Sequence, residues 1–78
     1  MTHEELKTAA AAKIVVIDAA LTTMDVPTIN KPANILPADD RVEQMLLAVD
    51  KVLQRQPLRK PQVRRLTRIR ELFSRFVA

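Results

Sequence analysis

The sequence predicts an all-α protein, a single small domain of three helices with a Pro-rich crossover between the first two. Apolar residues recur every three or four positions over three stretches, about 3–24, 39–55 and 61–77, which is the helical period. Three of the five prolines fall together between the first two stretches. The chain of 78 residues is too short for more than one domain, so 1–78 is expected to share one core.

The first helix is expected to begin after Thr2, because Thr2 and Glu5 have the Thr-x-x-Glu spacing of a capping box. Its apolar positions step by 4, 3, 4 and 3 residues, the rhythm of a heptad seam. Lys13 interrupts this stripe, and we expect its ammonium to reach the edge of the stripe. The β-branched run Ile14–Ile17 also fits a buried strand, which is the one alternative to helix in this stretch. The seam positions are Ala10, Ile14, Ile17, Leu21 and Met24.

Residues 25–38 form a Pro-rich linker within the domain. Pro27, Pro32 and Pro37 each remove an amide donor and push the preceding residue out of the α region, so no continuous helix can run through the segment. It is long for a connection in so small a domain. We expect an extended crossover that is mobile in its middle and anchored against the helices by Val26, Ile29, Ile35 and Leu36.

The second helix, about 39–55, has the most regular amphipathic pattern in the chain. Asp39 and Asp40 fall in its first turn, where negative charge suits the amide end of the helix dipole. Leu47 departs from the pattern, because it projects among acidic residues on the polar side. It is either a stray exposed leucine or a contact with the first helix or another subunit. The apolar face comprises Val42, Met45, Leu46, Val49, Val52 and Leu53.

The third helix, about 61–77, carries an apolar face and a separate cationic face. Pro61 suits its first position, where a missing amide costs nothing. The loop of about five residues before it makes the second and third helices antiparallel neighbours or a bent helix-turn-helix pair. Arg64, Arg68 and Arg75 project away from the apolar side. That apolar side comprises Val63, Leu66, Ile69, Phe73, Phe76 and Val77.

The composition argues against an enzyme and against a bound metal or cofactor. There is no Cys, and a single histidine, His3, cannot build a ligand cluster. Ser74 has no histidine near it in sequence to serve as a base, and the absence of Gly removes phosphate-binding loops. We therefore expect no catalytic residues, cofactor or small-molecule substrate.

Two further patterns bear on location. The N-terminus opens with Glu4 and Glu5, where a secretory signal would be positive. The apolar stretch from Ala9 to Leu21 is interrupted by charges and is short of the roughly 20 residues of a membrane span. The sequence therefore predicts a cytoplasmic protein without a membrane segment.

Charge is divided unevenly along the chain. Residues 1–54 hold five Lys or Arg and eight Asp or Glu, a balance of −3, whereas residues 55–78 hold eight and one, a balance of +7. Such a basic segment can follow nucleic-acid phosphates with little sequence preference. The alternative is a solvated face, with Glu71 bridging neighbouring arginines. The residues expected to contact the partner are Arg59, Lys60, Arg64, Arg68 and Arg75.

Base-specific recognition has little support in this segment. The second and third helices have the length of a helix-turn-helix, but the third offers only Gln62 as an amide for pairing with adenine. Arg65 and Arg70 lie beside the apolar face, where they are expected to pair with acids of the other helices across a subunit boundary. We therefore predict a small accessory or regulatory protein that contacts DNA or RNA backbone. The rival is an adaptor or inhibitor that uses the same arginines on an acidic protein surface, or its apolar helices in a groove.

The first helix is apolar around much of its circumference, which predicts a packed or intertwined homodimer or a higher oligomer. A chain of this length offers little surface of its own to cover such a helix. The residues expected at the interface between subunits are Ile14, Ile17, Leu21 and Leu47.

Overall fold

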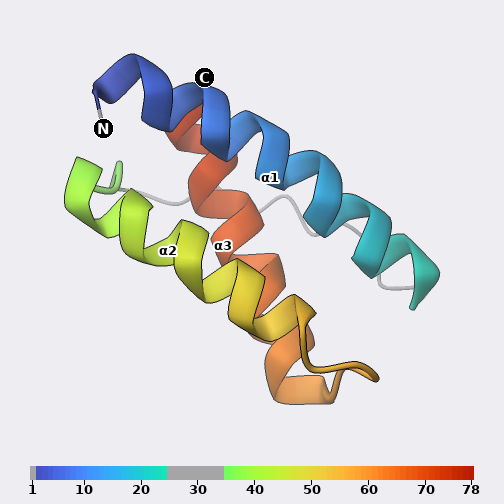
Figure 1. The fold of residues 1–78 in the computed structure, drawn as a ribbon. Coiled ribbons are helices and arrows are strands. Elements are labelled where there is room, and N and C mark those ends of the chain that lie inside the picture. Colours follow the sequence, from blue (N-terminus) through green and yellow to red (C-terminus); the bar gives the residue numbers. More distant parts are fainter. Residues whose placement is uncertain (1, 25–34) are drawn as a thin grey trace.

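A computed structural model describes residues 2–24 and 35–78 and shows three helices (Figure 1). Helix α1 spans His3–Thr23, α2 spans Asp39–Leu53 and α3 spans Lys60–Val77. Of the residues it describes, 81% are helical and none lies in a strand. The all-α prediction is confirmed, with each helix ending or beginning within two residues of the expected position. The run Ile14–Ile17 is helical, so the strand alternative is wrong.

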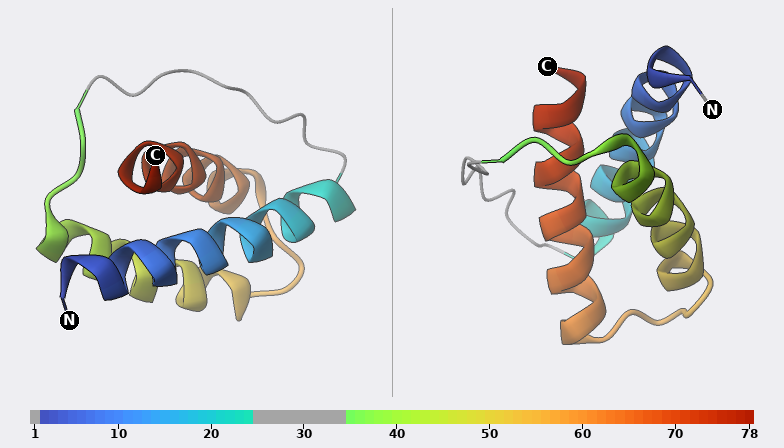
Figure 2. Two further views of the ribbon diagram at one scale, coloured as in Figure 1. Left: turned by 90° about the horizontal axis from the view of Figure 1, so that it is seen from above. Right: turned by 90° about the vertical axis from the view of Figure 1, so that its left-hand side faces the viewer.

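Helices α1 and α2 run in the same direction, and α3 returns in the opposite sense behind both of them (Figures 1 and 2). Two polar contacts between α1 and α2 are consistent with this parallel arrangement. His3 Nδ1 lies 2.9 Å from Asp39 Oδ1, and Lys13 Nζ contacts Asp50 Oδ1. Because α1 and α2 are parallel, the end of α1 and the start of α2 lie at opposite ends of the bundle, which accounts for the length of the connection. The expected conformation of residues 25–34 lies outside the described residues. Ile35 and Leu36 were expected to anchor the linker, but they are 78% and 62% exposed, so that part of the prediction is wrong.

Most helix starts have the cap and first-turn residues that the sequence predicted. Thr2 Oγ accepts a hydrogen bond from the Glu5 N–H at 3.2 Å, which confirms the cap of α1. Asp39 and Asp40 occupy the first turn of α2. Helix α3 begins at Lys60, one residue earlier than predicted, and Pro61 lies in its first turn, where its missing amide costs nothing.

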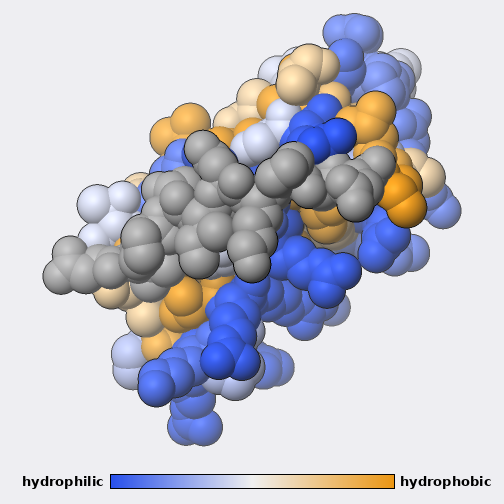
Figure 3. Space-filling view, turned by 180° about the vertical axis from the view of Figure 1, so that it is seen from behind, coloured by the Kyte–Doolittle hydropathy of each residue, from blue (hydrophilic) through white to orange (hydrophobic). Residues whose placement is uncertain are grey.

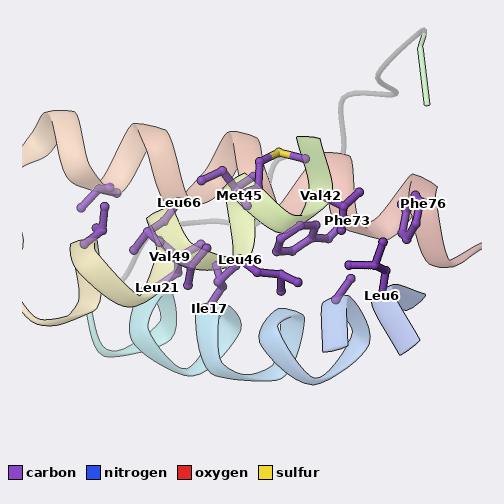
Figure 4. Packing of buried hydrophobic residues seen from close by; sticks show 14 residues of the cluster. Leu6, Ile17, Leu21, Val42, Met45, Leu46, Val49, Leu66, Phe73 and Phe76 are labelled. Atoms are coloured by element: carbon purple, nitrogen blue, oxygen red, sulfur yellow. The ribbon is translucent and has the colours of Figure 1, made fainter. Parts of the chain in front are cut away.

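The core lies where the three apolar faces meet (Figure 4). Phe73 of α3 is fully buried and lies at the centre of the contact with α1 and α2. The predicted apolar faces of α2 and α3 are confirmed, but α1 differs at both ends, because Leu6 is buried and Met24 is exposed. No polar or charged residue of the described part is buried. The buried set is Leu6, Ala10, Ile17, Leu21, Val42, Met45, Leu46, Val49, Val52, Val63, Leu66, Ile69, Phe73 and Phe76.

The residues expected at a subunit interface are divided between core and surface. Ile17 and Leu21 are buried by α2 and α3 of the same chain, and Ile14 packs at the edge of that core. Leu47 stays on the surface with 64% of its area exposed. The homodimer itself stays a prediction. The other two helices of the same chain cover more of α1 than the short chain length led us to expect. The large apolar residue of α1 with the greatest exposure is Val15, at 69%.

None of the three helices is long and apolar enough to span a lipid bilayer, within residues 2–24 and 35–78.

Candidate nucleic-acid interface

The candidate site is the end of the molecule where α2 finishes and α3 begins. Residues 51–70 contain eight Lys or Arg and no Asp or Glu. The last turn of α2, the loop 54–59 and the first half of α3 together carry this charge. Seen from behind, strongly hydrophilic side chains gather at this lower end of the molecule (Figure 3). We call it the basic end.

Three acids of the described residues contact cations or the histidine of another helix. Asp18 binds Arg70, Asp50 binds Lys13, and Asp39 contacts His3. These pairs join α1 to α2 and α3, and only the pair of Asp18 with Arg70 neutralises a cation of residues 51–70.

Among the residues that the structure describes, Arg70 is the one cation of residues 51–70 that is held by an acid. Its Nε donates to Asp18 Oδ1 at 2.6 Å, and its Nη1 donates to Ser74 Oγ at 3.2 Å. The hydrogen bond with Asp18 raises the pKa of Arg70 above its ordinary value, while partial burial opposes that rise. The expected pairing of Arg70 with an acid of the first helix is confirmed, but it lies within one chain. Arg70 is therefore a structural residue and not part of the interface.

The predicted contact residues are brought together with one exception. Arg59, Lys60, Arg64 and Arg68 are exposed along the start of α3. No ion pair joins them to a carboxylate in the part of the chain that the structure describes. Successive turns place Lys60, Arg64 and Arg68 about 6 Å apart along the helix axis. This row of cations is the centre of the candidate interface.

Arg75 does not belong to this row. It lies in the last turn of α3, about 16 Å along the axis from Arg64. Its side chain is half-buried, and its Nε is buried without a hydrogen-bond partner. Helical projection placed Arg75 on the cationic side, but projection alone cannot show which side chains tertiary packing covers.

Gln62 forms the cap of α3. Its Oε1 accepts the N–H of Arg59 at 2.8 Å, which fixes the entry of the loop into the helix. The one amide of the third helix that suited adenine is therefore engaged with the backbone. Contact with phosphates, rather than with base edges, is what the exposed side chains of this end can provide.

A groove between α2 and α3 adds cations that helix projection did not select. One stretch of it has a volume of about 470 Å³ and is open to solvent, and its apolar lining includes Leu47, Ala48 and Val52. Adjoining hollows extend it toward the loop and toward the middle of α3. Basic side chains line the groove in all three stretches, and no acid of the described residues does. They are Arg41, Lys51, Arg55, Arg59, Arg65 and Arg68.

Sequence reasoning missed the groove because it requires the packing of two helices. The charge balance of residues 55–78 was a signal for the basic end, but Lys51 and Arg41 come from α2 and fall outside that segment.

Within residues 2–24 and 35–78, no group of three or more His, Cys, Asp or Glu side chains is placed to hold a metal ion. Comparisons with protein-family models, curated proteins and solved structures found no match to this chain.

Proposed function

We propose that this protein binds nucleic acid through its basic end, by contacts with phosphates. The observation that carries the proposal is the run of residues 51–70, which has eight cations, no acid and only Arg70 engaged in an ion pair among the described residues. Each Lys or Arg that neutralises a phosphate releases counterions, so a group of exposed cations gains affinity for a polyanion without reading its sequence.

The start of α3 strengthens this electrostatic field. The first turn of a helix carries a partial positive charge from its unpaired amides, and α3 has no acid there to offset it. Arg59 precedes this turn, Lys60 begins it, and Arg64 lies one turn later. Helix dipole and side chains therefore attract an anion to the same place.

Weak sequence preference follows from the residues that are absent. The chain has no Tyr or Trp, and Phe73 and Phe76 are both buried, so no Phe, Tyr or Trp ring of the described residues is available to stack on a base. Gln62 is engaged in the cap of α3. The protein therefore acts as a non-catalytic accessory protein whose binding depends on charge and shape.

A direct titration tests the proposal. Labelled random duplex DNA, single-stranded DNA and RNA are titrated with the protein at low salt, and the double variant Lys60→Gln with Arg64→Gln is compared with the parent. We expect the variant to bind about tenfold more weakly, because each exposed charge contact contributes about 0.5–1 kcal/mol.

The matched control is Lys7→Glu, which lowers the net charge by the same two units near the start of α1, away from the basic end and from the groove. We expect it to change affinity by less than about threefold. Equal losses in both variants would mean that net charge alone drives binding and would remove the basic end from the proposal. A parent without affinity for any of the three ligands would overturn nucleic-acid binding, and the acidic protein surface would become the partner to test.

A further inference from the structure

We propose that a second copy of this chain docks over the α2 side of the groove, with the two α2 helices antiparallel and crossing at Leu47. The proposal concerns association of the protein with itself and does not depend on nucleic-acid binding. It rests on three features of the same molecule: apolar residues left uncovered, opposite charges at the two ends of α2, and a groove that lacks acids.

The uncovered apolar residues lie on and before α2. Leu47 is 64% exposed in the middle of the helix, and Ile35 and Leu36 are 78% and 62% exposed just ahead of it. The core does not use any of them. A soluble chain gains by covering such residues, since burying apolar area is the main favourable contribution to association.

The charges of α2 are arranged so that an antiparallel copy complements them. Glu43 lies four residues before Leu47 and Lys51 four residues after it. Asp39 lies eight residues before, and Arg55, just beyond the helix end, eight residues after. A two-fold axis at Leu47 therefore places Glu43 against Lys51 of the partner and Asp39 against Arg55 of the partner, each contact occurring twice. A parallel arrangement would instead oppose like charges.

The groove gives the acidic start of the partner's α2 a place to bind. Its walls carry Lys51, Arg55 and Arg65 without an acid, and its lining includes Leu47 and Ala48. An occupant therefore needs negative charge and some apolar surface. The segment 35–43 has both, because Ile35 and Leu36 are followed by Asp39, Asp40 and Glu43.

The size of a stable interface requires this whole surface. A specific interface buries about 800 Å² on each partner, which is about one seventh of the 5517 Å² that the chain exposes. Leu47 alone cannot provide that area. Antiparallel docking extends the contact from Leu47 along α2 to the loop 54–59 at one end and to Ile35 and Leu36 at the other.

The outer face of α1 is the competing surface, with Val15 and Val16 exposed. It lacks the charge pattern that selects a partner, because the positions four residues before and after Val15 are Ala11 and Ala19. Docking along α2 also leaves Lys60 and Arg64 outside the contact, since neither lines the groove. The dimer then presents two copies of that part of the basic end.

Sedimentation equilibrium at tens of micromolar protein, without nucleic acid, tests the proposal. The parent should be a dimer, and Leu47→Asp should weaken the dimer by at least about thirtyfold, as expected for the centre of an interface. Val15→Asp is the matched control, because its site is equally exposed on another helix, and it should leave the dimer intact. A monomeric parent, or a dimer lost in Val15→Asp and kept in Leu47→Asp, would overturn the proposal.

Charge reversal tests the antiparallel alignment. Lys51→Glu and Glu43→Lys should each weaken the dimer by about tenfold, because each replaces two attractions by two repulsions. The double reversal should regain about tenfold over either single variant, since opposite charges face each other again. Glu43 also has an interaction within its own chain, and the loss of that interaction is common to Glu43→Lys and the double variant. Residues 43 and 51 lie about 12 Å apart on one helix, so recovery requires the partner, and its absence would overturn the alignment.

Discussion

Replacing Asp18 by Ala removes the acid that holds Arg70 against the core and so tests how α1 is fixed to α3. Arg70 is mostly buried, and its Nε donates to Asp18 at 2.6 Å. At about 4 Å and an effective dielectric of about 20, two charges attract by about 4 kcal/mol, but desolvation offsets much of this. The Asp18 side chain is 42% exposed, so water screens the pair further. We expect Asp18→Ala to lower the free energy of unfolding by about 1–2 kcal/mol.

This loss is a large share of the stability of a chain this short. At about 0.05–0.15 kcal/mol per residue, the protein is expected to unfold with about 4–12 kcal/mol. Thermal unfolding followed by circular dichroism should show a melting temperature lower by about 4–16 °C. All variants are compared at one protein concentration, because any dimer makes the midpoint concentration-dependent.

A double-mutant cycle with Arg70→Met isolates the pair. The doubly substituted protein should be more stable than the sum of the single effects predicts, by about 1 kcal/mol, because no charge is left without its partner. Asp50→Ala serves for comparison, since it breaks the more exposed pair with Lys13 and should cost less than about 1 kcal/mol. Additive effects of Asp18→Ala and Arg70→Met, or a loss below about 0.3 kcal/mol in Asp18→Ala, would refute this account of the pair.

Three other substitutions have expected outcomes. Phe73→Ala should destabilise the protein by about 3–5 kcal/mol in urea unfolding, because the ring is fully buried among three helices; a loss below about 1 kcal/mol would contradict the described core. Ile17→Asp should unfold the chain rather than yield a folded monomer, since Ile17 is buried within one chain, and a folded helical monomer by circular dichroism and sedimentation would show otherwise. Thr2→Ala should cost about 1 kcal/mol by removing the cap of α1, and unchanged stability would mean that the cap is unimportant.

The helices could be predicted from the sequence because their signals are local. Three such signals are the period of apolar residues in α2, the Thr2 cap, and the prolines at positions 27, 32 and 37. Each acts over a few positions and does not depend on contacts with other helices. The burial of Leu6 and the exposure of Met24 could not be predicted in the same way. Burial at a helix end depends on where α3 crosses, and Phe76 at the far end of α3 lies close to the start of α1, with its ring centroid 5.1 Å from that of His3.

The candidate site was partly predictable for the same reason. Charge balance along the chain identified Arg59, Lys60, Arg64 and Arg68, whose exposure the structure shows. It could not exclude Arg75, because the partial burial of that side chain depends on tertiary packing. The groove also required the packing of α2 against α3, since Arg41 and Arg65 are far apart in sequence.

The salt dependence of duplex binding tests the central claim most directly. The logarithm of affinity is measured against the logarithm of salt concentration for the parent and for Lys60→Gln with Arg64→Gln. If both side chains contact phosphates, the slope should flatten by about 0.9 for each, or about 1.8 in total. Circular dichroism should show the variant folded, because both residues are exposed. An unchanged slope in the folded variant, or an affinity of the parent that does not fall with salt, would contradict phosphate binding by the basic end.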